Sequence, residues 1–148
     1  VVHGESAGGP FDRYHVRYTR SHDGARTFEP GREISRPHPE RIESEAFPAL
    51  SLDEQDNAYV LWEIYPERHE PPHGLAIAYS RDGGQTFSAP AIVPGSSDPA
   101  GGWNGSHQGL LMRKLGVKRA GDIAVVNSSL KHHEKSRVWL MRGQLGQR

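Results

Sequence analysis

Side chains that could bind or transform a polar ligand gather in four Pro- and Gly-rich stretches of this sequence, at residues 35–46, 65–74, 94–107 and 128–136. Six of the nine histidines lie there, together with arginines, acids and a tryptophan. Arginine pairs with carboxylates through two parallel hydrogen bonds, so such a surface suits a sugar acid. The ligand-binding residues that we expect are Arg36, His38, Arg41, Glu43, His69, His73, Trp103, Asn104, His107, His132 and His133.

The histidines also raise a transition-metal hypothesis, because imidazole suits zinc or copper. His69 and His73 have the H-x-x-x-H spacing that places two ligands on one helix face, but the two prolines between them disfavour a helix. His132 and His133 are adjacent, so they point apart in a strand and converge only in a loop. Solvated loop histidines explain the same pattern, and we predict no metal and no cofactor.

Two copies of one motif, SHDGARTF at residues 21–28 and SRDGGQTF at 80–87, lie 59 positions apart. Asp and Ser side chains accept hydrogen bonds from nearby backbone N–H groups, and Gly adopts positive φ. A calcium loop needs more carboxylates, and a phosphate loop ends in Gly-Lys-Ser/Thr. We therefore predict structural turns, with the Phe packed on the core, built from Ser21, Asp23, Gly24, Thr27 and Phe28 and from Ser80, Asp82, Gly83, Gly84, Thr86 and Phe87.

The elements that position these residues are predicted to be β-strands. Gly (17) and Pro (11) are plentiful, only 34% of residues are apolar, and no long helical pattern is present. Val16 and Tyr18 align with Leu75 and Ile77, in the alternation of half-buried strands, and a weaker third copy places Val138 on Leu75. The strands are expected near 1–5, 14–20, 30–35, 47–52, 57–64, 74–80, 90–94, 108–114, 122–128 and 136–142.

The motif S-x-D-x-G-x-T-F, with its preceding alternating strand and following proline, resembles the Asp-box, or BNR repeat, of the sialidase-like β-propellers. Residues 80–87 match fully, and residues 21–28 depart at Ala25. The resemblance implies an all-β fold of propeller blades, each a four-stranded antiparallel sheet. Residues 1–148 would form a partial propeller, since closure takes about 4 to 8 blades. The end of blade one would cover 1–35, blade two 47–94 and most of blade three 107–142.

The resemblance also implies that the Asp-boxes lie on the face opposite the active site, which leaves the four polar stretches on the functional face. Sialidases use three arginines, a Tyr nucleophile assisted by a Glu, and an Asp acid/base. Ala46 stands where the first arginine of an R-I-P phrase is expected, and HQGLL in blade three has no such phrase. Tyr65 and Glu63 are close in sequence, but Glu63 recurs as Glu5, with one residue of slack in the alignment, which favours a structural role. We assign no catalytic residue, and enzymatic activity stays open, with the balance against it.

Three functions therefore remain. The favoured one is a non-catalytic segment that binds a protein or glycan, or serves as an accessory subunit of a larger assembly. The alternatives are part of an exo-glycosidase (sialidase) acting on sialic-acid-type sugars and a transition-metal site on the histidine face. The expected partners are other chains or the missing remainder of the propeller, with a glycan as a further candidate; we favour a cut longer protein over completion by another chain or by copies.

Composition excludes two classes of partner. Lys+Arg and Asp+Glu both number 18, so the chain lacks the basic excess that nucleic acid requires. No apolar run approaches the roughly 18 residues of a membrane span. Without cysteine there is no disulfide framework. We expect an extracytoplasmic or secreted location, as the resemblance implies.

Overall fold

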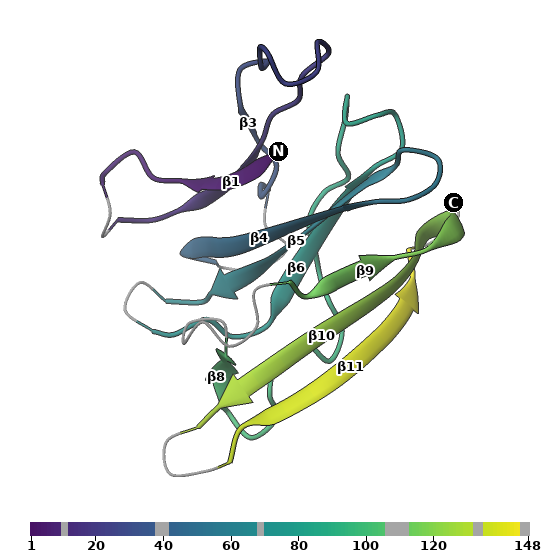
Figure 1. Cartoon of the computed structure of the whole chain (residues 1–148). Coiled ribbons are helices and arrows are strands. Elements are labelled where there is room, and N and C mark those ends of the chain that lie inside the picture. The colour runs from purple at the N-terminus through teal and green to yellow at the C-terminus, as the bar shows by residue number, and fades with distance from the viewer. Residues whose placement is uncertain (10–11, 38–41, 68–69, 106–112, 132–134, 146–148) are drawn as a thin grey trace.

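A computed structural model describes the chain except for residues 10–11, 38–41, 68–69, 106–112, 132–134 and 146–148 (Figure 1). The described residues form an all-β fold, as predicted, with one short 3-10 helix, η2 (Arg119–Gly121). The strands are β1 (Val2–Glu5), β2 (His15–Tyr18), β3 (Arg32–Glu33), β4 (Ser44–Leu52), β5 (Ala58–Tyr65), β6 (Leu75–Ser80), β7 (Ala91–Ile92), β8 (Trp103–Asn104), β9 (Leu115–Val117), β10 (Asp122–Leu130) and β11 (Arg137–Gln144).

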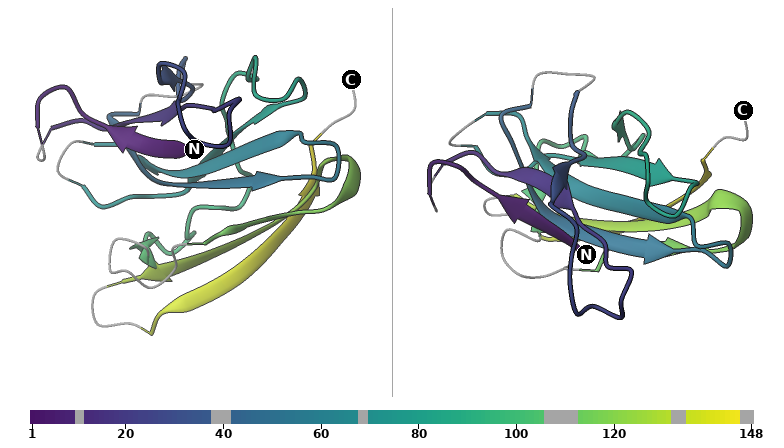
Figure 2. Two further views of the ribbon diagram at one scale, coloured as in Figure 1. Left: turned by 45° about the horizontal axis from the view of Figure 1, so that its top comes forward. Right: turned by 90° about the horizontal axis from the view of Figure 1, so that it is seen from above.

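Three antiparallel sheets follow one another along the chain and lie in successive layers (Figure 2). Sheet one has the order β1-β2-β3, sheet two β4-β5-β6-β7, and sheet three β11-β10-β8, with β9 also paired to β10. Sheets two and three are four-stranded, and none of the three closes on itself. In the described part of the chain no helix is long and apolar enough to cross a membrane.

Nine of the ten predicted strands coincide with β1 to β7, β10 and β11, and the exception is the one expected at 108–114. Most of that range lies outside the described residues. Two short strands, β8 and β9, instead pair with opposite ends of β10. In sheet two the corresponding strand, β4, runs continuously beside β5 apart from a bulge between Ala46 and Ala49. Among the described residues, β8 and β9 therefore take the place in sheet three that β4 has in sheet two.

The pairing registers show that the 59-residue repeat extends through whole sheets. Val16 lies opposite Gly4 in sheet one, and Leu75, the equivalent of Val16, lies opposite Glu63 in sheet two. Gly4 is therefore the equivalent of Glu63, and Glu5 lies one residue beyond that position, within the one-residue slack of the sequence alignment. A shift of one residue reverses the face of a strand, so the two glutamates project from opposite faces.

Sheet three follows the same register, with Val138 as the equivalent of Leu75. Under this alignment Asn104, opposite Ser129 in sheet three, takes the place of Glu45 in sheet two. Glu45 contacts His15, and Asn104 contacts Gly74, which lies 59 positions after His15. The weak third copy seen in the sequence is thus the third unit of one repeating arrangement.

Alternation along the strands produces two apolar layers between the sheets. The first, between sheets one and two, contains Val16, Tyr18, Ile34, Val60, Trp62, Ile64, Ala76 and Ala78. The second, between sheets two and three, contains Leu61, Leu75, Ile77, Val93 and Val125. Sheet two is consequently buried on both faces, which explains why β5 reads as a continuous apolar run.

The two turns at residues 21–28 and 80–87, here called the S-x-D turns, have the same hydrogen-bond pattern. One carboxylate oxygen of Asp82 accepts hydrogen bonds from the backbone of Gln85 and Thr86, each at 2.8 Å, and the other accepts from the Thr86 hydroxyl at 2.6 Å. The Ser80 hydroxyl accepts from the Gly84 amide at 2.8 Å. Equivalent bonds at Ser21 and Asp23 close the first turn.

The aromatic residues that end the two S-x-D turns differ in their surroundings. Phe87 packs on the layer between sheets one and two, as expected from the sequence. Phe28 was expected to pack in the same way, but 48% of its surface is exposed. The difference follows from position, because Phe87 faces sheet one, whereas Phe28 faces away from the stack.

Candidate functional site

Buried polar side chains meet between the sheets at the end opposite the S-x-D turns. We call this the loop end; it comprises the last residues of β5 and β10 and the first residues of β2, β4 and β6. Burying a polar group is unfavourable unless hydrogen bonds replace the lost water, so such clusters have either structural or functional causes. Two clusters occupy this end of the described structure.

The first cluster joins sheets one and two through His15. Its Nδ1 lies 2.8 Å from Glu45 Oε2, and its Nε2 lies 3.2 Å from Nη2 of Arg36. Arginine can only donate, so Nε2 accepts and Nδ1 carries the hydrogen that is donated to Glu45. Burial raises the pKa of the fully buried Glu45, and the hydrogen bond from His15 opposes this shift. The imidazole therefore holds the buried carboxyl group in place.

The arginines of this cluster are already paired with carboxylates. Arg36 lies 3.1 Å from Glu33, and Arg13 lies 2.5 Å from Glu43. A substrate carboxylate would have to compete with these protein carboxylates for either guanidinium group. These two described arginines thus lack the open geometry of a carboxylate-binding site.

The second cluster joins sheets two and three through a buried ion pair, in which the ammonium group of Lys114 donates to Glu63. Lys114 also donates to Oδ1 of Asn127 at 2.7 Å, and the Asn127 amide donates to the Ser96 carbonyl at 2.8 Å. The second carboxylate oxygen of Glu63 is buried with no hydrogen-bond partner among the described residues. Burial lowers the pKa of Lys114, and the Glu63 charge counteracts this effect.

Tyr65 lies close enough to this pair for the Glu63 charge to affect it. Burial, followed by that negative charge, raises the pKa of Tyr65 to about 12. The phenol therefore stays protonated at neutral pH. A tyrosine nucleophile needs an activating base or a lowered pKa, and this environment acts in the opposite direction.

The predicted ligand residues are only partly brought together. Arg36 and Glu43 lie at the first cluster, Asn104 lies between sheets two and three, and Trp103 is half-buried beside it in β8. The amide of Asn104 is engaged internally, donating to the Gly74 carbonyl at 2.8 Å and accepting from its N–H at 3.1 Å. His73 is half-buried, and its backbone N–H donates to the Ile64 carbonyl at 2.9 Å. The remaining predictions, His38, Arg41, His69, His107, His132 and His133, fall outside the described residues.

Where the structure describes the chain, no three histidine or acidic side chains are grouped as metal ligands would be. Five of the six histidines on which the metal hypothesis rests, all except His73, lie outside the described residues.

Sequence reasoning did not identify Lys114, Asn127 or His15 as members of buried clusters. Lys114 follows Arg113 and has the appearance of a surface lysine. Its partner Glu63 is 51 positions away, so only the pairing of whole sheets brings them together. A usable signal was Glu63 itself, because a single carboxylate within the apolar run of β5 requires a buried partner.

No protein-family model matches the chain, and no curated protein matches it.

Proposed function

We propose that this chain is a segment of a sialidase-like Asp-box β-propeller and that it works as a non-catalytic interaction module. In this proposal the three sheets are successive blades. The outermost sheet faces pack against further β-sheets, provided by other chains or by the remainder of a propeller. A partner would bind by packing one of its own β-sheets on an outermost face of the three-sheet stack.

One observation carries the proposal: the exposed apolar side chains lie where the repeat leaves a sheet face uncovered. In the described residues, the large hydrophobic side chains that are exposed are Val1, Phe28, Leu50, Leu52, Val138 and Leu140. Val138 and Leu140 are 68% and 52% exposed, whereas their equivalents Leu75 and Ile77 are buried beneath sheet three. Val138 and Leu140 lie two residues apart on one face of β11, and exposed apolar side chains gathered on a sheet face mark a protein interface.

The first strand of sheet two, β4, gives the same indication. Leu50 and Leu52 lie on the face of β4 that is turned toward sheet one, and both are exposed. Leu115, the equivalent of Leu50 in sheet three, packs on the apolar layer beside sheet two. A strand paired with the free edge of β1, in the place that β4 has beside β5, would cover Leu50 as β4 covers Leu115.

The loop-end geometry supports binding over hydrolysis. Arg13 and Arg36 are ion-paired with protein carboxylates, and Tyr65 has a raised pKa. The carboxylates of Glu45 and Glu63 are committed to His15 and Lys114. The described polar residues at the loop end thus form ion pairs and hydrogen bonds with one another and do not form a catalytic centre.

Sedimentation equilibrium tests the proposal. With its apolar face uncovered, the isolated chain should associate with itself as its concentration rises, since burial of apolar surface drives association. Val138→Asp with Leu140→Asp should keep it monomeric. The matched control is Ala25→Asp with Ala89→Asp, at one exposed position in the first S-x-D turn and one just after the second, and this variant should associate like the wild type. A monomeric wild-type chain, or equal association of all three proteins, contradicts the proposal.

Hydrolysis of a fluorogenic sialic-acid glycoside separates the module from a sialidase. We expect no turnover above the buffer rate. Turnover that disappears in Glu63→Gln and Tyr65→Phe would instead support the glycosidase alternative.

A further inference from the structure

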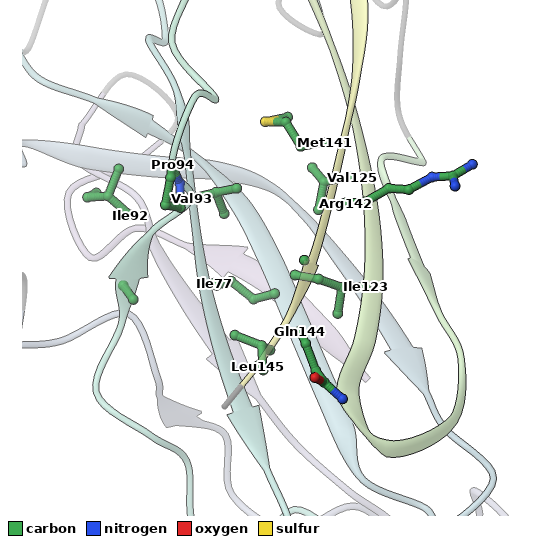
Figure 3. A pocket seen from close by; sticks show the side chains of 12 residues that line it. Ile77, Ile92, Val93, Pro94, Ile123, Val125, Met141, Arg142, Gln144 and Leu145 are labelled. Atoms are coloured by element: carbon green, nitrogen blue, oxygen red, sulfur yellow. The ribbon is translucent and has the colours of Figure 1, made fainter. Parts of the chain in front are cut away.

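The space between the outer strands of sheets two and three contains a cavity of about 370 Å³. Ile77, Val93 and Pro94 lie on its sheet-two side, and Ile123, Val125, Met141, Gly143 and Leu145 on its sheet-three side (Figure 3). Its walls are mainly apolar, with Arg142 and Gln144 near the rim. An apolar cavity of this size, open beside a strand edge, is suited to apolar side chains of an extended segment.

The corresponding space between sheets one and two is filled by the chain itself. Phe87, four residues before β7, and Ile92, the last residue of β7, pack there on the apolar layer. The Phe87 ring lies 4.9 Å from the ring of Tyr18, and Tyr18 is the equivalent of Ile77 in the cavity wall. The same two positions in sheet three would therefore project into the cavity.

The outer edge of sheet three has no strand beside it in the described residues. β11 pairs with β10 on one side, whereas its equivalent in sheet two, β6, pairs with both β5 and β7. A row of unpaired backbone groups on an edge strand is a template for an added strand. The open edge and the cavity are adjacent, so one extended segment can use both.

We propose that β11 and this cavity bind an extended segment of a partner polypeptide by strand addition, with an aromatic and, five residues later, an aliphatic side chain inserted between sheets two and three. The segment would run antiparallel to β11 and pair at Trp139 and Leu140, the equivalents of Ala76 and Ile77. The site continues the existing interface between sheets two and three, because the same side chains of sheet two line both.

A second folded copy of this chain fits the site less well than a separate segment. Its own Phe87 and Ile92 are packed within the first apolar layer and would have to leave it. Its edge strand β1 carries no aromatic residue. The partner chemistry is therefore an extended, apolar-aromatic segment; this inference rests on the proposed function, since it specifies one element of the missing neighbour.

The chain contains a ready probe, the peptide GGQTFSAPAIVPG of residues 83–95, which performs this packing between sheets one and two. Titration of the labelled peptide into the whole protein, followed by fluorescence anisotropy, should show saturable binding. A peptide with Phe87→Ala and Ile92→Ala should bind at least about tenfold more weakly, because two buried apolar side chains are lost.

A variant of the protein locates the binding site. Gly143 lines the cavity, and a Cβ there would meet its nearest neighbour, Ile123, at an ordinary 3.9 Å. Gly143→Phe should fill the cavity and lower peptide affinity at least about tenfold, while Gly116→Ala, also in sheet three and with similar space, leaves it unchanged. Circular dichroism establishes that both variants are folded.

Absence of wild-type binding, equal binding of the two peptides, or undiminished binding by folded Gly143→Phe would each overturn the strand-addition proposal. If Gly143→Phe does not fold, loss of amide exchange along β11 on peptide addition to wild type supports the site, and its absence overturns it. Failure here leaves sedimentation of the Val138→Asp, Leu140→Asp variant as a separate test of the proposed function.

Discussion

The ring of Phe87 lies 4.9 Å from the ring of Tyr18, although the two residues belong to different sheets. Arg32 covers both rings, with its guanidinium carbon 5.6 Å from each centroid, and donates to backbone carbonyls of the second S-x-D turn. A turn of sheet two is thereby fastened to sheet one. The equivalent Phe28 projects from the outer face of sheet one and remains exposed.

This difference predicts unequal effects of the same substitution. Phe87→Ala should lower the free energy of unfolding by about 2 kcal/mol, less than for a fully buried phenylalanine because Phe87 is half-buried. Phe28→Ala should change it by less than about 0.5 kcal/mol in the monomer. Urea unfolding measures both, and equal destabilisation would show that Phe87 does not anchor the turn.

The Gly84 and Ala25 positions predict a second asymmetry. Both have positive φ, +79° and +67°, but a Cβ on Gly84 would meet the Tyr18 hydroxyl at 2.2 Å. Gly84→Ala should therefore destabilise the protein by about 1–3 kcal/mol, as overpacking does. Ala25→Gly should be nearly neutral, because relief of backbone strain and the greater entropy of the unfolded chain oppose each other. A tolerated Gly84→Ala in thermal unfolding would contradict the packing.

The buried pair of Lys114 and Glu63 predicts strong coupling. Lys114→Met alone should cost about 3–5 kcal/mol, since Glu63 would be left charged and unpaired in the interior, and Lys114→Met with Glu63→Leu should recover most of this loss. Arg119 and Glu54 form a pair at 2.7 Å that is largely exposed, so Arg119→Met should cost less than about 1 kcal/mol. A double-mutant cycle by urea unfolding measures the coupling; additive effects would contradict it.

Glu45 predicts a pH dependence of stability. Burial raises its pKa above the ordinary 4.5, so the folded protein binds this proton more tightly than the unfolded chain. Its contribution to the free energy of unfolding should therefore be largest below about pH 4.5 and fall as pH rises through the raised folded value. Glu45→Gln should remove this component, so the wild-type minus variant difference should decrease over that range. An increase with pH would reverse the assigned direction.

The strands and the repeat could be predicted because they depend on local alternation and turn chemistry. Val16 and Tyr18 align with Leu75 and Ile77 at a fixed distance from the S-x-D turns, and the structure places both pairs on the face toward the next sheet. The slack at Glu5 arose because alignment without pairing partners leaves a one-residue uncertainty. The pairing of β1 with β2 removes this uncertainty, because it places Gly4 opposite Val16.

The buried clusters and the exposed aromatic could not be predicted in the same way. His15 and Glu45 meet between sheets one and two, and Lys114 reaches Glu63 between sheets two and three, so each contact depends on how whole sheets stack. Phe28 ends the first copy of the motif as Phe87 ends the second. Only the position of its sheet in the stack decides whether a neighbouring sheet covers it.

The central claim is that the repeat continues beyond sheet three, across the face that carries Leu140. The chain has no cysteine, so Leu140→Cys and Ala89→Cys each provide one unique site for a nitroxide label. The measurement is the paramagnetic resonance spectrum of each label as protein concentration is raised. We predict that the label at 140 becomes immobilised as the chain associates while the label at 89 stays mobile. A label at 140 that stays mobile in the associated protein, or a chain that never associates, would contradict the claim.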